Sequence, residues 1–318
     1  MGKNLPAKLA LSTRVAHSYT LCGWRTLSEI PLTGVPTLVN EADPEVVIEV
    51  ATEHPPTAPN TDKFVFLHAA ECSVIKIKGV ADFEIREGRQ IRVWPAKGAT
   101  QKEIEIFLFG QAWATLCYQR GILPLHASAV VTGKGITAFA GRSGAGKSTT
   151  AALLNSLGYE LIADDILPVS LNQHSLPGAW PYLRRLKLHH HPIVQFGFTP
   201  TEVVSEVDNQ KYFIHPKHAG VDKWRSLERI YVLEKDASDC HSTIERVTGA
   251  EAVRALVDQS YHFKFVLGTR RFGDHLAFCT RVASRIPIYS LRLSSLRDAG
   301  ERLGSLICAH LESGGEQP

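Results

Sequence analysis

The sequence contains no long hydrophobic run: its most apolar stretches, such as residues 136–140, are only as long as a β-strand. A helix that crosses a bilayer needs about 20 mostly apolar residues, so we expect no transmembrane segment and no membrane partner. The amino-terminal region turns polar at Ser12, Thr13 and Arg14, where a secretion signal would have its apolar centre. We therefore expect no secretion signal.

Cysteines are few and far apart, and no two of them form a C-x-x-C pair. This spacing argues against a disulfide framework and against a zinc ribbon. The expected location is a reducing cytoplasm. The six cysteines are Cys22, Cys72, Cys117, Cys240, Cys279 and Cys308.

Neither sign of charge dominates, since 35 Lys and Arg face 32 Asp and Glu for a formal net charge of +3 at pH 7. This excess is too small for the broad basic surface of a nucleic-acid-binding protein, so no nucleic-acid partner is expected. The hydrophobic fraction of 44% and the charged fraction of 21% are typical of a folded soluble chain. A length of 318 residues suggests about two domains.

The amino-terminal region is rich in β-strand signals. Several of its segments concentrate β-branched and aromatic residues, and two of them alternate apolar and charged residues around the turn sequence Glu-Gly-Arg-Gln at 87–90. We predict a small sheet with one wet face in a first domain, residues 1–98. The predicted strands are residues 46–50, 64–67, 74–78, 83–86 and 91–94.

The remaining residues, 99–318, mix helix and strand signals and form the second predicted domain. A capping box, Thr100-x-x-Glu103, begins a predicted helix that Gly121 ends. Strand and helix patterns then alternate, which indicates an α/β fold. We predict strands at 126–131, 136–140, 159–163, 230–233 and 286–293, and helices at 149–157, 249–263 and from about 295 onward.

A glycine-rich loop fits the pattern G-x-x-x-x-G-K-S without a mismatch and lies between a predicted strand and a predicted helix. Its backbone N–H groups and the amino end of the helix favour phosphate oxygens. Lys147 is expected to reach the β- and γ-phosphates, and Ser148 to coordinate Mg²⁺, so we predict ATP, or GTP, with Mg²⁺. The predicted nucleotide-binding residues are Gly141, Arg142, Ser143, Gly144, Ala145, Gly146, Lys147, Ser148 and Thr149.

Asp164 and Asp165 follow the strand predicted after the loop helix, at the sheet edge where α/β proteins bind ligands. Two carboxylates beside a magnesium nucleotide can divide the work, since one holds the metal and the other accepts a proton. A turn or helix cap after the strand is the alternative interpretation. His126 opens another predicted strand, a position that by itself is more typical of a structural histidine.

Residues 126–165 combine the sequence His-Ala-Ser-Ala-Val-Val, the glycine loop and the sequence Leu-Gly-Tyr-Glu-Leu-Ile-Ala-Asp-Asp. This stretch resembles the core of bacterial HPr kinase/phosphorylase, in which a strand histidine, a phosphate loop and an aspartate pair form one site. The resemblance implies an α/β P-loop kinase core of the HPr kinase C-terminal type. It also implies that Asp165 is the catalytic base, that Asp164 is the metal-side partner and that His126 tunes the base.

The chain also departs from that family. Ala127 stands where the family usually has glycine, Thr149 where it has an acidic residue, and residues 182–187 only loosely match its Glu-Ile-Arg-Gly signature. With its β-rich amino-terminal part and its Leu-Pro-Leu-His lead-in, the chain is more similar to the divergent branch found with lasso-peptide biosynthesis. Members of that branch phosphorylate the C-terminal serine of a precursor peptide.

The resemblance therefore implies an ATP-dependent serine kinase whose partner is a precursor peptide, or a protein, that bears an acceptor serine. Two other functions remain open. One is a small-molecule kinase, and the other is a non-enzymatic nucleotide-bound sensor or peptide-binding module, because the same loop serves many functions. The sequence leaves the oligomeric state open, a homo-oligomer included.

Basic residues gather before three consecutive histidines, residues 189–191. Arg185 and Lys187 are candidates for contacting phosphate or acceptor, because a cation can neutralise a phosphoryl group during its transfer. By itself, such a basic run is more typical of a solvated strand face. Arg270 is a further candidate, on a predicted loop. Successive residues of a strand point to opposite faces, so the three histidines predict no metal site.

Overall fold

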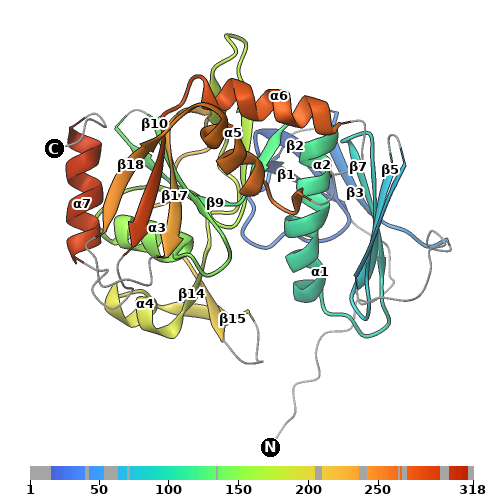
Figure 1. Ribbon diagram of the computed structural model, residues 1–318. Helices are drawn as coiled ribbons and strands as arrows, with labels where there is room; N and C mark the ends of the chain where they lie inside the picture. The colour runs from blue at the N-terminus through green and yellow to red at the C-terminus, as the bar shows by residue number, and fades with distance from the viewer. Residues whose placement is uncertain are drawn as a thin grey trace, which may run out of the picture. The chain divides into compact units, whose positions relative to one another are not determined.

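The chain has a mixed α/β fold and forms two compact units, shown in Figure 1. Unit 1 comprises Met1–Ile122 and His262–His275, and unit 2 comprises Leu123–Tyr261 and Leu276–Pro318. The predicted domain boundary at residue 98 divides the chain differently and stays a prediction. The computed structural model describes residues 16–39, 43–53, 64–69, 72–133, 135–204, 210–235, 242–263, 266, 271–293 and 301–313.

Unit 1 contains a seven-stranded sheet in the order β1-β2-β3-β7-β6-β5-β4. The predicted hairpin is confirmed as β6 and β7, with Phe83 opposite Val93 and Ile85 opposite Ile91. All four side chains are fully buried. The strands are β1 (His17–Leu21), β2 (Trp24–Ser28), β3 (Val46–Val50), β4 (Phe64–Ala69), β5 (Cys72–Ile77), β6 (Ala81–Arg86) and β7 (Gln90–Pro95).

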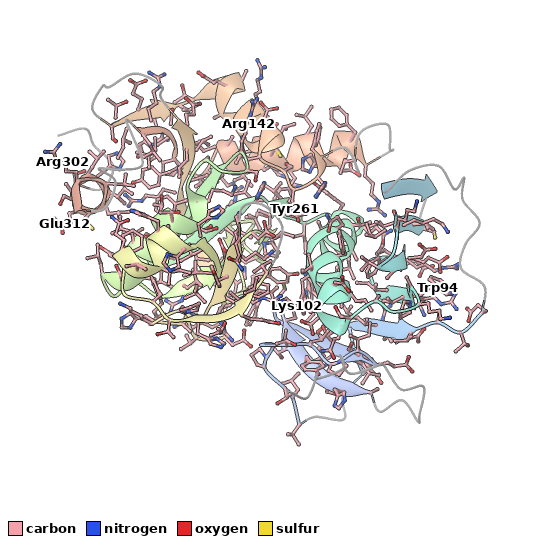
Figure 2. The ribbon with its side chains drawn as sticks, turned by 90° about the horizontal axis from the view of Figure 1, so that it is seen from below. Trp94, Lys102, Arg142, Tyr261, Arg302 and Glu312 are labelled. Carbon is pink, nitrogen blue, oxygen red and sulfur yellow. The ribbon has the colours of Figure 1, made fainter. Side chains whose placement is uncertain are left out.

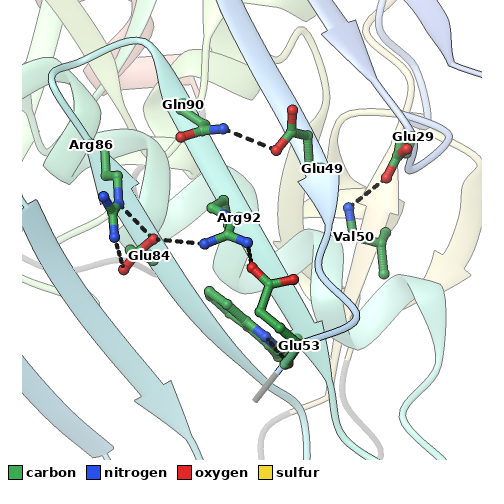
Figure 3. Close-up of polar contacts among 9 residues, drawn as sticks. Glu29, Glu49, Val50, Glu53, Glu84, Arg86, Gln90 and Arg92 are labelled. Atoms are coloured by element: carbon green, nitrogen blue, oxygen red, sulfur yellow. Dashed lines mark hydrogen bonds and ion pairs between the residues drawn. The ribbon is translucent and has the colours of Figure 1, made fainter. Parts of the chain in front are cut away.

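The opposite face of β6 and β7 carries paired charges (Figure 3). Glu84 accepts hydrogen bonds from Arg86 at 2.7 and 2.9 Å, and it lies opposite Arg92 in the strand register. Arg92 also pairs with Glu53 and lies over the ring of Trp94. Cross-strand pairs of opposite charge stabilise a sheet, so this polar face supports the hairpin register.

One helical segment of unit 1 has three parts: α1 (Gln101–Phe107), the π-helix η1 (Leu108–Ala112) and α2 (Trp113–Gln119). The predicted capping box is confirmed, because Thr100 Oγ1 accepts from the Glu103 N–H and Glu103 accepts from the Thr100 N–H. Gly121 follows the helix at φ 67°, a left-handed conformation that glycine adopts without strain. Local signals thus set both ends of the segment.

His275 provides a prediction about acid stability. It is 7% exposed and packs against the rings of Tyr118 and Phe263, and burial lowers its pKa to about 4. Below about pH 6.5 the unfolded chain binds a proton at His275 that the folded chain excludes. The free energy of unfolding should therefore fall by roughly 3 kcal/mol as the pH drops from about 6.5 to about 4.

Urea unfolding of the wild type and of His275→Leu at about pH 7 and about pH 4.5 would measure this effect. The wild type should lose more stability between the two pH values than the variant, because leucine has no proton to bind. An equal loss in both proteins would mean that His275 does not titrate in this way.

Unit 2 contains a nine-stranded sheet in which β11-β9-β10-β17-β13-β12-β8 are successive neighbours, while β19 pairs with β17 and with β18. β10, β17 and β19 are parallel. The strands are β8 (Leu123–Leu125), β9 (Ala127–Thr132), β10 (Gly135–Gly141), β11 (Leu161–Ala163), β12 (Leu167–Leu171), β13 (Pro177–Ala179), β17 (Arg225–Lys235), β18 (Thr243–Val247) and β19 (Ile288–Leu293).

A smaller sheet of unit 2 has the order β14-β16-β15. Its strands are β14 (Leu186–His189), β15 (Pro200–Val203) and β16 (Lys211–Ile214).

The helices that follow α2 in the chain are α3 (Lys147–Ser156), α4 (His190–Gln195), α5 (Gly249–Asp258), α6 (Phe272–Ala283) and α7 (Glu301–Glu312). Among the described residues, no helix combines the length and apolarity that spanning a membrane requires.

Several predicted boundaries were wrong. His126 lies between β8 and β9 rather than at a strand start, and the helix predicted at 249–263 ends at Asp258. The three histidines do not share a strand, because His189 ends β14 while His190 and His191 begin α4. The start predicted near residue 295 for the last helix lies outside the described residues.

An aromatic ladder crosses the parallel strands of unit 2. Phe139, Tyr231 and Tyr289 occupy matching register positions on β10, β17 and β19, and adjacent rings stack with centroids 5.4 Å apart. His310 of α7 bonds the Tyr231 hydroxyl at 2.7 Å. These rings belong to one hydrophobic core with α3 and α7, which lie beside the sheet in Figure 1. The core fixes the strands and the helix that carry the site.

Candidate active site

The topology of unit 2 brings three predicted groups to one edge of the sheet. β10 and β11 run in the same direction, because each pairs antiparallel with β9 between them. Their carboxyl ends, Gly141 and Ala163, therefore lie at the same edge as the amino end of β9, Ala127. The glycine loop follows β10, the aspartate pair follows β11 and His126 precedes β9.

The glycine loop runs directly from β10 into α3, as predicted. Gly141 has φ 153°, and a Cβ atom there would lie 3.0 Å from the carbonyl oxygen of Leu233 and 3.1 Å from Ala145 Cβ. Gly146 has φ 106° just before the helix begins. Both glycines thus permit a backbone path that a larger residue would disturb. Arg142, Ser143 and Gly144 are exposed, and Thr149 is partly buried on α3.

Lys147 lies beneath the loop, with only 7% of the residue exposed. Its ammonium donates hydrogen bonds to the carbonyl oxygens of Gly141 at 2.8 Å and Arg142 at 3.2 Å. Burial lowers the pKa of Lys147, while the carboxylates of Asp164 and Asp165 act in the opposite direction. A lysine held inside a loop of backbone carbonyl and N–H groups is well placed to meet an anion.

Asp164 is 3% exposed and fully hydrogen-bonded. Its Oδ1 accepts from Ser128 Oγ at 2.5 Å and from Ser148 Oγ at 2.8 Å, and its Oδ2 accepts from the Lys187 N–H at 2.9 Å. Burial raises the pKa of Asp164, and the hydrogen bonds from Ser128 and Lys187 oppose that rise. The bond to Ser148 shows that the aspartate pair and the glycine loop face each other.

Asp165 is more open, with 31% of its side chain exposed. Its Oδ2 lies 3.0 Å from Lys187 Nζ, and its Oδ1 lies 3.5 Å from His126 Nε2. Burial raises the pKa of Asp165, but the charges of Lys187 and His126 outweigh burial and lower it overall. Asp165 also has φ 77°, in the left-handed region that few residues other than Gly, Asn and Asp enter. The carboxylate is therefore ionised and held at both oxygens.

His126 is fixed by contacts that the sequence does not reveal. Its backbone N–H donates to the carbonyl oxygen of Gln259 at 2.7 Å. Its imidazole ring and the Tyr261 ring form an edge-to-face contact, with their centroids 5.3 Å apart. Tyr261, labelled in Figure 2, follows α5. Burial, with a contribution from Asp165, raises the pKa of the Tyr261 hydroxyl. No local motif pointed to this tyrosine.

The other three candidates for contacting phosphate or acceptor have different outcomes. Lys187 joins the site, and the guanidinium of Arg185 stacks over the Phe213 ring at 4.2 Å. Arg270 lies outside the described residues. Ser128 contacts Asp164, although sequence reasoning missed its role within the His-Ala-Ser-Ala stretch.

In the part of the chain that the structure describes, no group of three or more His, Cys, Asp or Glu residues could hold a metal.

Comparisons with known proteins show a distant likeness to solved structures. No protein-family model matches this chain, and no curated protein matches it. Among solved structures, it is similar to the HPr(Ser) kinase/phosphatase from Coxiella burnetii, with 12% sequence identity, a TM-score of 0.30, and coverage of 59% of this chain and 95% of that chain. At this level the likeness carries no conclusion about chemistry, so the site residues must support any function.

Proposed function

We propose that this chain is a Mg²⁺- and ATP-dependent serine kinase that acts on a peptide or protein. The observation that carries this proposal is the 2.8 Å hydrogen bond between Ser148 of the glycine loop and Asp164. It puts the aspartate pair beside the loop that would hold the triphosphate. Phosphoryl transfer depends mainly on such positioning and on neutralisation of charge, both of which these residues can supply.

The oxygen atoms of Ser148 and Asp164 suit a magnesium ion. Magnesium prefers oxygen ligands and is usually held by one or two carboxylates together with substrate phosphates. These two side chains supply a hydroxyl and a carboxylate that already lie within hydrogen-bond distance. Bound magnesium would neutralise phosphate charge, and Ser148 and Asp164 would hold it.

Asp165 would accept the proton of the acceptor hydroxyl in this proposal. The seryl oxygen would form a bond to the γ-phosphorus of ATP as the bond between that phosphorus and the β–γ bridging oxygen breaks. The bridging oxygen would leave with ADP. The ammonium of Lys147 would exchange its loop carbonyl partners for phosphate oxygens. His126 would hold Asp165 through Oδ1. Each of these side chains comes from the sheet edge described above.

We further propose that the acceptor is the C-terminal serine of a lasso-peptide precursor. The support for this substrate is the resemblance to the lasso-peptide branch in the β-rich amino-terminal part and the Leu-Pro-Leu-His lead-in, together with the departures from HPr kinase/phosphorylase at Ala127 and Thr149. A free carboxylate next to the acceptor hydroxyl would distinguish such a substrate from a serine inside a protein.

A panel of synthetic peptides with Mg-ATP, analysed by mass spectrometry, would test both proposals. The panel contains peptides that end in serine, the same peptides with an amidated end, peptides with an internal serine, and peptides that end in alanine. Small hydroxylated metabolites are assayed beside the peptides. One added phosphate on the free serine ends is the expected result. Phosphate on small hydroxylated metabolites alone would indicate a small-molecule kinase. ATP binding without ADP release would indicate a sensor or peptide-binding module.

A further inference from the structure

Lys187 contacts both carboxylates of the candidate site through two different groups. Its backbone N–H donates to Asp164 Oδ2 at 2.9 Å, and its side-chain ammonium lies 3.0 Å from Asp165 Oδ2. One residue of β14 thus ties together the two aspartates that would divide the metal and proton roles.

The strand itself explains this double contact. β14 is an edge strand, so the Lys187 N–H can donate to Asp164 instead of to a neighbouring strand. Leu186 and Leu188 are buried in the core of unit 2, and side chains alternate along a strand. Lys187 therefore points to the opposite face, where Asp165 lies.

The Lys187 side chain is also restrained along its length. Phe213 lies opposite Lys187 in the β14–β16 register, and its ring centre is 6.0 Å from the ammonium. Only 25% of the Lys187 side chain is exposed. Because the strand and the ring limit where the ammonium can go, its contact with Asp165 is a defined feature of the site.

We propose that Lys187 is a positioning residue that orients the carboxylate of Asp165 toward the acceptor hydroxyl and acts through that carboxylate, not on the transferred phosphate. The proposal rests on the proposed kinase function. His126 holds Oδ1 and Lys187 holds Oδ2, so loss of the ammonium would let the carboxylate turn. The bond to Asp164 uses only the backbone N–H of residue 187, which every residue except proline retains, so changing the side chain separates the two contacts experimentally.

A double-mutant cycle between Lys187→Met and Asp165→Asn tests this role. With Mg-ATP and the best peptide of the panel, Lys187→Met should lower kcat by a factor of about 10 to 100, with KM for ATP within about threefold, because a misplaced catalytic group costs rate more than binding. In the Asp165→Asn background the same substitution should change kcat by less than about twofold. Lys187→Arg should recover part of the rate, since a guanidinium also donates to a carboxylate.

Lys223→Met is the matched control, because it removes an exposed lysine from the same unit and should leave turnover unchanged. If Lys187→Met lowers kcat equally in both backgrounds, Lys187 acts directly on substrate and the proposal is overturned. If the wild type transfers no phosphate to any peptide, the kinase function fails and this inference fails with it. If the wild type is active but the two substitutions lower kcat independently of each other, the kinase function stands and only this inference fails.

Discussion

Replacing Asp165 by asparagine is expected to slow phosphoryl transfer by a factor of about 10² to 10⁴, the usual contribution of a general base. The amide cannot accept the seryl proton, whereas the loop, Lys147 and Asp164 keep their contacts. The affinity for Mg-ATP should therefore change little. Single-turnover transfer to a peptide and calorimetric titration with Mg-ATP would measure the two effects separately.

Asparagine is the appropriate substitution because Asp165 has φ 77°, a backbone conformation that asparagine tolerates better than alanine does. Asp258→Asn provides a control at an exposed carboxylate on α5 that pairs with Arg254. Transfer at the wild-type rate in Asp165→Asn would exclude Asp165 as the base and would also remove the target through which Lys187 is proposed to act.

Replacing Lys147 by alanine is expected to weaken Mg-ATP binding by a factor of about 10 to 100 and to slow transfer as well. A hydrogen bond to a charged group contributes about 1.5–3 kcal/mol, which corresponds to this range of dissociation constants. The loss should exceed that at an exposed lysine, because Lys147 is buried beneath the loop and holds the Gly141 and Arg142 carbonyls. Binding and transfer should fall together, unlike in Asp165→Asn.

Calorimetry with Mg-ATP and a thermal melt of the unliganded variant would show whether the loss is one of binding or of folding. Lys147→Arg adds a further check. Because Lys147 is buried, with 7% of the residue exposed, the larger guanidinium should not fit in its place, and this variant should also bind Mg-ATP more weakly. Unchanged affinity in Lys147→Ala would show that this loop does not bind the triphosphate.

Elements with strong local signals could be predicted from the sequence. The hairpin of β6 and β7 follows from alternation and a turn, and the helix after Thr100 follows from its capping box with Glu103. The helix after the glycine loop begins at Lys147, close to its predicted start. In each case the residues that determine the element lie within a few positions of one another, so the pattern is visible without knowledge of the fold.

Contacts between distant segments could not be predicted in this way. β14 has four residues, and its pairing with β16 depends on a long connection that carries α4 and β15. The position of Tyr261 beside His126 likewise depends on how α5 ends. The contact of Lys187 with Asp165 follows from that tertiary register, which explains why its strand appeared from sequence to be a solvated face.

The π-helical turn η1 has a consequence for chain length. A π turn holds about one residue more than an α turn, and each residue of an α-helix rotates the chain by about 100°. Deleting one residue between Leu108 and Ala112 would turn the π turn into an α turn, which completes the same rotation with one residue fewer, so α2 would keep its present azimuth. Trp113 and Leu116 would then stay on the buried side, whereas one inserted residue would turn them away by about 100°, so this segment should tolerate a single-codon deletion better than a single-codon insertion.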